Sequence, residues 1–364
     1  MTKKRKIEFD CGIPLPDFSK PVTHEDWVLA VFPEWKTYLN QQINSYEVPK
    51  GQVSMWWCGC CSWVIKTDEG SIFCIDMYAG PSGHTHYGQC GVCRQTGAES
   101  IHWMRLQPHY VDPWAFDHID GYFMSHIHGD HTDPWFISAA VNTSDTKFYG
   151  PKLVTDLLPN YQVPGDRIVT CQVGDVIELP GAKVHMLINY DQTAIQTLGG
   201  EMMDYEDCCL SYLFETSGGN LLFLGDTWFH DGYVAFPQKY KIDVTTTNMG
   251  FNAPGGTDKL TPYEVARLAK MLKTNVIIPD HYDFWANIAG EPNLIIDQFE
   301  RLTHEIAPEV KTVVMRGGGR FDYPKDQDIG RYWYPDESGG YRYEYSATAI
   351  EEAERTKRRD RKNA

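Results

Sequence analysis

The 364-residue sequence has no run of 18 apolar residues, and so has no candidate for a membrane-spanning helix. Its basic start, residues 1–6, leads into Ile7-Glu8-Phe9-Asp10, whereas a secretory signal would continue with an apolar stretch. We therefore expect a cytoplasmic protein with no membrane partner.

Positive charge is scarce, because 33 Lys and Arg residues face 49 Asp and Glu residues, for a net charge of -16. Binding to nucleic acid depends on Lys and Arg that neutralise phosphates, so we expect no nucleic-acid partner.

The sequence also lacks internal repeats and low-complexity linkers, while 42% hydrophobic residues suffice for a large core. We expect a helical arm over 1–48, a catalytic domain over 49–335 and a charged tail over 336–364.

Among the 10 cysteines, one CxxC pair lies in a glycine-rich loop. This pair, with two histidines upstream, fits either a structural zinc site or an ordinary reduced loop (Cys90, Cys93, His84 and His86). Four other cysteines lie in or beside apolar, strand-like segments and are expected to be small buried thiols (Cys58, Cys60, Cys61 and Cys74).

Short apolar and β-branched segments alternate with amphipathic ones along most of the chain. Helices are expected over 24–39, interrupted near Pro33, and over 134–141, 229–239, 261–272 and 292–307. Strands are expected over 53–67, 71–77, 122–124, 167–173, 182–188, 208–215, 220–224, 243–246 and 275–278. This alternation predicts two sheets with helices packed outside.

Four metal-competent side chains follow the predicted strand 122–124 within six positions: His126, His128, Asp130 and His131. The two histidines at i and i+2 converge when the loop is extended, and the next two side chains turn to the other side. One loop can therefore serve two cation positions.

Two later segments each place a possible ligand at the end of a predicted strand. Gly225-Asp226 follows an apolar run, and the Asp226 carboxylate can bridge two cations. Asp280-His281 ends another run and adds an imidazole. Either segment alone fits an ordinary turn or cap, but in this order with the histidine loop they predict a metal-dependent hydrolase.

With these motifs the sequence resembles the metallo-β-lactamase superfamily, and within it the L-ascorbate-6-phosphate lactonases. The resemblance implies an αββα sandwich, a layered α/β (α+β) fold with the metals at one edge between the sheets. Besides the histidine loop it is carried by Phe32-Pro-Glu-Trp35, Met55-Trp-Trp57, Leu106-Gln-Pro108, Asp191-x-Thr193-Ala194, Thr257-Asp-Lys259, Pro279-x-His281-x-Asp283-x-Trp285 and Gly318-Gly-Arg-Phe321.

The resemblance also implies a ligand set. His126 and His128 would hold a first cation, and a second would be held by Asp130, His131 and His281 with Asp226 shared. The superfamily's third ligand of the first cation, a His, is missing from 188–191. We predict Asp191 in its place, and expect His185, deeper in the strand, to be structural.

Both the resemblance and the carboxylates favour Mn²⁺, with Zn²⁺ second, and the altered third ligand allows one or two ions per chain. A bound cation lowers the pKa of water from 15.7 to about 7, and Asp130 is the predicted catalytic residue that orients this water and carries its proton.

The resemblance implies opening of the lactone ring of L-ascorbate 6-phosphate or a similar sugar-acid phosphate. The predicted substrate-binding residues for such a small anion are Asn252, Thr257, Lys259 and Arg320, beneath a loop over 79–112 with His84, His86 and Arg94.

The alternatives are a phosphodiesterase or another lactonase on the same fold, or a catalytically silent metal-binding regulatory protein. The aromatic N-terminal arm also suggests a homo-oligomer.

Overall fold

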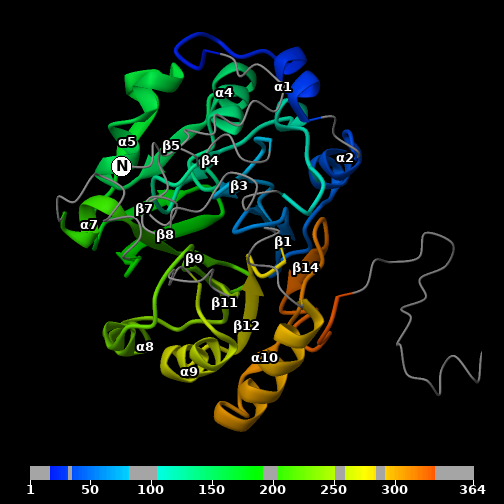
Figure 1. Ribbon diagram of the computed structural model, residues 1–364, viewed down its shortest axis with the longest axis vertical. Coiled ribbons are helices and arrows are strands. Elements are labelled where there is room, and N and C mark those ends of the chain that lie inside the picture. Colours follow the sequence, from blue (N-terminus) through cyan, green and yellow to red (C-terminus); the bar gives the residue numbers. More distant parts are fainter. Residues whose placement is uncertain are drawn as a thin grey trace, which may run out of the picture.

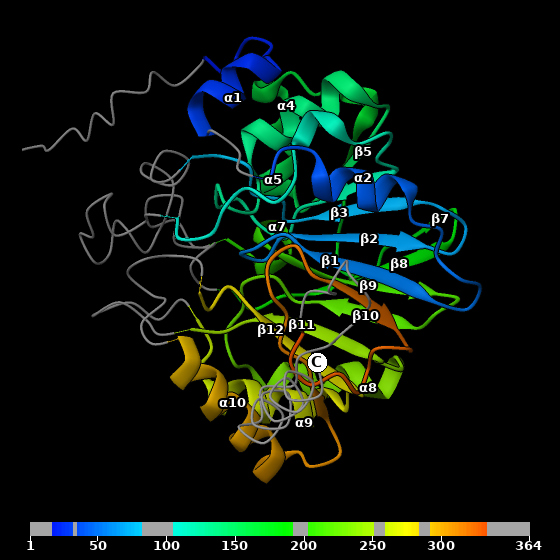
Figure 2. The ribbon, with the colours of Figure 1, turned by 90° about the vertical axis from the view of Figure 1, so that its right-hand side faces the viewer.

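The computed structural model describes residues 17–31, 35–81, 105–191, 203–250, 259–283 and 292–332. Two seven-stranded mixed sheets stack face to face, with helices on both outer faces (Figures 1 and 2). The predicted αββα sandwich is confirmed.

The first sheet has the strand order β14-β1-β2-β3-β4-β5-β6. Its strands are β1 (Val53–Trp57), β2 (Trp63–Thr67), β3 (Ile72–Ile75), β4 (Gly121–Phe123), β5 (Lys147–Gly150), β6 (Ile168–Thr170) and β14 (Arg320–Tyr323). The prediction of one strand over 53–67 is wrong. A turn separates β1 from β2, because Gly59 and Cys60 have positive φ and the Ser62 amide donates to the Gly59 carbonyl at 2.8 Å.

The second sheet has the order β13-β12-β11-β10-β9-β8-β7. Its strands are β7 (Val176–Leu179), β8 (Ala182–Ile188), β9 (Leu210–Thr216), β10 (Asn220–Phe223), β11 (Val244–Asn248), β12 (Val276–Asp280) and β13 (Lys311–Thr312). The predicted strands from 182 onward lie here, with ends that differ by one or two residues. Strands β5, β7, β13 and β14 were not expected, because they are only two to four residues long and carry little apolar periodicity.

Helices cover both sheets. On the first sheet lie α1 (His24–Val31), α2 (Tyr38–Ser45), α4 (Pro134–Thr143) and α5 (Lys152–Thr155), with α7 (Tyr205–Cys208) beside α5. On the second lie α8 (Phe236–Lys239), α9 (Pro262–Leu272) and α10 (Pro292–Ile306). The helix expected over 229–239 is a 3₁₀ turn, Asp231–Ala235, followed by the short α8. Further 3₁₀ turns are Pro113–Ala115, Leu158–Tyr161 and Gly165–Arg167.

Aromatic packing holds the two sheets together. The Phe123 ring stacks on Tyr149 at 4.5 Å between centroids and meets Phe214 edge-on at 5.0 Å. A second apolar cluster joins the outer face of the first sheet to the N-terminal helices, where Trp27 and Leu39 are buried. The described parts of the N-terminal arm, residues 17–31 and 35–48, therefore pack on the sandwich. The tail over 336–364 lies outside the described residues.

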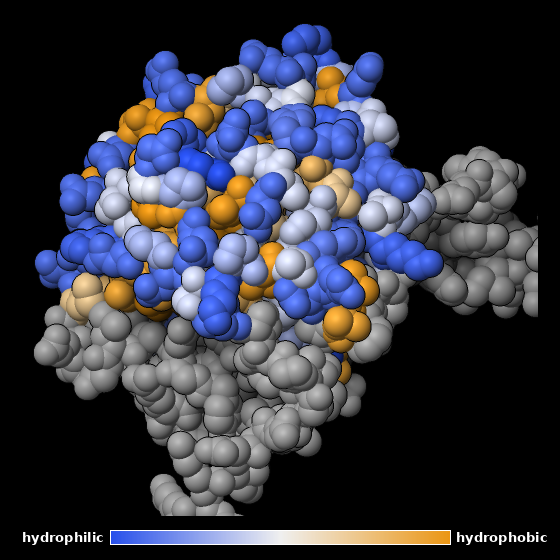
Figure 3. Space-filling model, turned by 90° about the horizontal axis from the view of Figure 1, so that it is seen from above, coloured by the Kyte–Doolittle hydropathy of each residue, from blue (hydrophilic) through white to orange (hydrophobic). Residues whose placement is uncertain are grey.

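No helix in the described ranges is long and apolar enough to cross a membrane. Hydrophilic residues cover most of the coloured face in Figure 3, with hydrophobic ones in small groups between them.

Strand direction determines where polar loops gather. β1 and β3 are both antiparallel to β2, and β4 is parallel to β3, so β1, β3 and β4 run the same way. In the second sheet β8, β10 and β12 share one direction by the same reasoning. The loops that follow these strands carry the candidate ligands, as expected for a site at the carboxyl ends of strands.

Candidate metal centre

The histidine loop leaves β4 and folds back on itself over 125–132. The His131 amide donates to the His128 carbonyl at 2.9 Å, and the Thr132 hydroxyl donates to the His126 carbonyl at 2.6 Å. These bonds turn four side chains inward, and all four are at least nine-tenths buried (His126, His128, Asp130 and His131).

The donor atoms form three groups, two of which share residues, and within each group they lie within 4.8 Å of one another. The first group contains His126, His128 and Asp191. The other two both contain His131 and His281. Cys60 and Asp130 complete one of them, and Cys61 and Asp226 complete the other. All seven predicted ligands therefore converge. Asp226 falls in a group with His131 and His281, so its role as a ligand shared with the first cation stays a prediction.

The end of β8 supplies an aspartate where the superfamily pattern has a histidine. An Asp191 carboxylate oxygen lies 3.6 Å from His126 Nε2. The neighbouring Asn189 amide instead donates to the Asp226 carbonyl at 3.1 Å and ties β8 to the loop after β10. His185 pairs with Glu215 on β9 at 3.1 Å, in line with the structural role expected for it.

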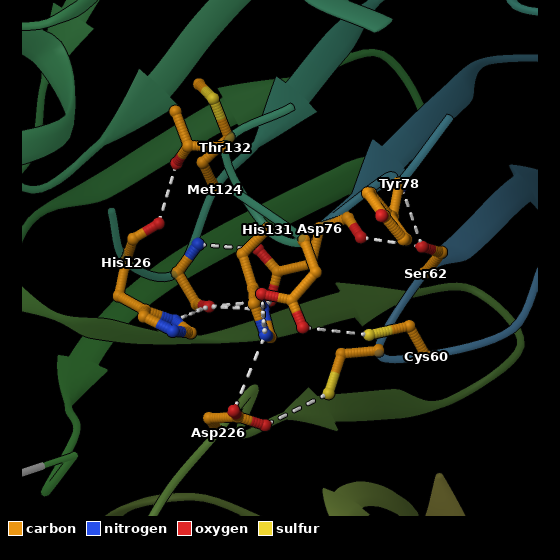
Figure 4. Close-up of polar contacts among 12 residues, drawn as sticks. Cys60, Ser62, Asp76, Tyr78, Met124, His126, His131, Thr132 and Asp226 are labelled. Atoms are coloured by element: carbon orange, nitrogen blue, oxygen red, sulfur yellow. Dashed lines mark hydrogen bonds and ion pairs between the residues drawn. The ribbon is translucent and has the colours of Figure 1, made fainter. Parts of the chain in front are cut away.

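Asp76, which sequence reasoning missed, orients the histidines. Its carboxylate accepts from the Ser125 amide at 2.7 Å, from the Ser125 hydroxyl at 2.6 Å and from His131 Nδ1 at 2.9 Å. The same hydroxyl lies 3.0 Å from His126 Nδ1. Figure 4 shows His131 between Asp76 and Asp226. The available signal was its place directly after the apolar β3, as Asp226 follows β10.

A glycine gives the Asp226 loop room to approach the histidine loop. Gly225 has φ +64°, and a Cβ there would lie 2.6 Å from the Ser125 hydroxyl oxygen. An added side chain would therefore displace the serine that lies against His126 and His131.

Two thiols also reach the cluster, although the sequence indicated only buried structural cysteines. Cys60 Sγ lies 3.2 Å from His281 Nε2 and 3.4 Å from an Asp130 oxygen. Cys61 Sγ lies 3.3 Å from Asp280 and 3.5 Å from Asp226. The predicted burial of all four thiols is confirmed, but these two lie at the site because the turn after β1 directs them there.

The residues fit a bound divalent cation. Within the described part of the chain, His126 Nε2 and His131 Nε2 are buried without a hydrogen-bond partner, while the Nδ1 atom of each is held by Ser125 or Asp76. This arrangement presents Nε2 as a metal ligand, with the other ring nitrogen fixed by an oxygen. The buried carboxylates of the cluster also need a compensating positive charge.

The electrostatics of the cluster are strongly perturbed. Burial alone would lower the pKa of His131, but the carboxylates of Asp130, Asp76 and Asp226 raise it well above its usual value. Burial would raise the pKa of Asp226, whereas the Lys259 ammonium, with His281 and His131, holds it well below the usual range. Burial, with the neighbouring His131 and His128, lowers the pKa of His126 well below its usual value.

The predicted substrate residues lie in different parts of the structure. Lys259 is buried and forms an ion pair with Asp226, so its ammonium already neutralises a site carboxylate. The Arg320 guanidinium lies over the Tyr46 ring at 3.7 Å and bonds Asp322 at 3.1 Å on the outer face of the first sheet, so the structure does not bring it to the donor cluster. The remaining predicted substrate and pocket residues lie outside the described residues (Asn252, Thr257, His84, His86 and Arg94). So do Cys90 and Cys93 of the possible zinc site.

A cavity of about 380 Å³ lies beside the segment that follows His281. Its wall includes Tyr282, Asp283, Gln107 and Arg316. Burial raises the pKa of Asp283 to about 6, although the Gln107 amide donates to its carboxylate at 2.5 Å.

Comparison with known proteins identifies the family. A family model described as "Beta-lactamase superfamily domain" matches residues 96–282. The "Probable L-ascorbate-6-phosphate lactonase UlaG" of Escherichia fergusonii is 32% identical in a comparison over 331 residues that covers 87% of this chain and 94% of that protein. The chain belongs to the metallo-β-lactamase superfamily. The Salmonella paratyphi B protein of the same name is also 32% identical, over 86% of this chain and 93% of its own.

Solved metallo-β-lactamase-like structures share the fold. Igni18, described as a novel metallo hydrolase from Ignicoccus hospitalis, has a TM-score of 0.53 and 17% identity, over 75% of this chain and 98% of its own. An isothiocyanate hydrolase from Delia radicum gut bacteria has a TM-score of 0.54 and 17% identity, over 74% of this chain and 98% of its own. The chain thus combines this fold with the buried His, Asp and Cys donors of a metal-dependent hydrolase.

Proposed function

We propose that this protein hydrolyses the lactone ring of L-ascorbate 6-phosphate or of a similar sugar-acid phosphate. The observation that carries the proposal is the buried donor cluster at one edge of the sandwich. It occurs in a chain whose similarity covers 94% of the length of a relative named as a probable L-ascorbate-6-phosphate lactonase. The alternatives on this fold, a phosphodiesterase or a lactonase for another ring, become outcomes of the test.

The reaction adds water to the lactone carbonyl, breaks the bond between the acyl carbon and the ring oxygen, and leaves a carboxylate and a hydroxyl group. A divalent cation, proposed as Mn²⁺ or Zn²⁺, would be held by the donor groups above and would supply a more acidic water and a polarised carbonyl. Asp130 is the proposed proton carrier, since its carboxylate lies 3.2 Å from His281 Nε2 within the cluster. Asp76 and Ser125 hold the imidazoles in place for this step.

We place the phosphate end of the substrate in the cavity beside Tyr282 and Asp283, where Arg316 lines the wall. A planar guanidinium suits a phosphate better than a point charge does. Arg316→Gln is expected to raise KM for the phosphorylated lactone with little change in kcat. Arg320→Gln is the matched control, because that arginine contacts Tyr46 and Asp322 on the outer face.

The decisive experiment loads metal-free protein with Mn²⁺ or with Zn²⁺ and measures opening of L-ascorbate 6-phosphate beside hydrolysis of a phosphodiester. We expect lactone opening, and a loss of about 10²–10⁴-fold in kcat for Asp130→Asn. His126→Ala is expected to lose activity, whereas His185→Ala, which alters a histidine paired with Glu215, should keep it. Hydrolysis of the phosphodiester without lactone opening would contradict the proposal.

We also propose a cytoplasmic location. The seven cysteines in the described ranges are free thiols, which suits a reducing compartment.

A further inference from the structure

The turn between β1 and β2 directs one thiol into the metal centre. Gly59 has φ +85° and Cys60 has φ +53°, a left-handed conformation that costs a non-glycine residue about 1–3 kcal/mol. Two donors hold the Cys60 carbonyl in that place: Trp57 Nε1 at 2.9 Å and the His281 amide at 3.2 Å. The strained turn is thus tied directly to the residue that carries a metal-competent imidazole.

The resulting spacing is that of ligands around one ion. Cys60 Sγ lies 3.2 Å from His281 Nε2 and 3.4 Å from the Asp130 carboxylate, and these atoms with His131 form a group within 4.8 Å. In a tetrahedral zinc site with Zn–S of about 2.3 Å and Zn–N of about 2.0–2.1 Å, sulfur and nitrogen lie about 3.5 Å apart. A buried structural thiol requires no such convergence of two ligand residues on its sulfur.

We infer that Cys60 Sγ is a metal ligand, the fourth donor of a site completed by Asp130, His131 and His281. This inference rests on the proposed metal-dependent function and sharpens it, because a thiolate favours Zn²⁺ and other soft cations over Mn²⁺. This position therefore binds Zn²⁺ in preference to Mn²⁺.

Neighbouring cysteines provide matched controls. Cys58 lies in the same turn, but its thiol is directed at the Trp56 carbonyl at 3.9 Å, and it belongs to the outer apolar cluster. Cys61 also belongs to a donor group, with His131, Asp226 and His281, but its Sγ lies nearer to Asp280, at 3.3 Å, than to Asp226, at 3.5 Å. Cys61→Ser therefore tests the competing assignment of the thiolate ligand. Serine variants of the three residues therefore separate a ligand from its buried neighbours.

The test replaces the cation with Co²⁺ and records its absorption spectrum. Wild type, Cys58→Ser and Cys61→Ser are expected to show both ligand-field bands and a near-ultraviolet thiolate-to-cobalt charge-transfer band. Cys60→Ser should keep ligand-field bands but lose the charge-transfer band. Losing a residue that only orients a metal ligand typically weakens metal binding by roughly 10–100-fold, so the Zn²⁺ affinity of Cys60→Ser should fall by at least that much. Its Mn²⁺ affinity should fall by less.

Two results would overturn the inference: wild-type protein that binds Co²⁺ without the charge-transfer band, or a band that disappears in Cys61→Ser and persists in Cys60→Ser. Circular dichroism and a second variant, Cys60→Ala, guard against misfolding. The spectrum is independent of turnover. Lactone opening without the band refutes the ligand role alone, and a band without lactone opening refutes the proposed function alone.

Discussion

Replacing Asp76 with Asn tests whether the carboxylate behind His131 determines metal affinity. One Asp76 oxygen accepts from both the Ser125 hydroxyl, at 2.6 Å, and His131 Nδ1, at 2.9 Å. An amide nitrogen at that position can accept neither bond. If it donates to Nδ1 instead, the imidazole proton moves to Nε2, which then cannot bind a cation. Asp76 is therefore a positioning residue.

We expect Asp76→Asn to weaken metal binding by about 10–100-fold, or about 1.4–2.7 kcal/mol. Competition with a fluorescent chelator measures this affinity directly, without relying on turnover. The matched control is Asp112→Asn, a buried carboxylate that contacts His24 Nε2 at 2.7 Å in another part of the fold. Unchanged affinity in Asp76→Asn, or an equal loss in the control, would refute the reasoning.

Three further outcomes are expected. Lys259→Met should destabilise the metal-free protein by about 3–5 kcal/mol in urea unfolding, because the buried Asp226 carboxylate loses its ammonium partner, and added metal should recover much of the loss; an equal loss with and without metal would count against this. Gly225→Ala should abolish metal binding, since its methyl group would lie 2.6 Å from a serine hydroxyl, whereas Gly174→Ala, also at positive φ but in open space, should keep it in the same titration. Phe123→Ala should lower the free energy of unfolding by about 3–5 kcal/mol, and a loss below about 1 kcal/mol would show that the stacked aromatic core is not needed.

The sequence predicted most of the layered fold because its longer strands and helices have clear apolar patterns. It also predicted seven donors that converge in space, since each follows an apolar strand. Asp76 escaped notice because a single acid after a strand is a common turn signal. Cys60 escaped because the apolar run from Val53 hid a turn that depends on the Gly59 backbone.

The substrate residues were harder to predict for a different reason. A charged side chain near a motif carries no sign of the direction in which it points. Lys259 turned inward to a carboxylate, and Arg320 turned outward to Tyr46, because the strand and loop geometry around each decides this. Such directions depend on pairing between distant segments, as when β14 joins β1.

The scattering of the donors over separate strand ends has a mechanical consequence. Cys60 and His281 are 221 positions apart in the chain, and one lies after a strand of the first sheet while the other lies after a strand of the second. An ion held by both would cross-link the two halves of the sandwich, and it would stabilise the fold by binding the folded chain and not the unfolded one. It would do so without an oxidising environment, and it would be reversible by a chelator.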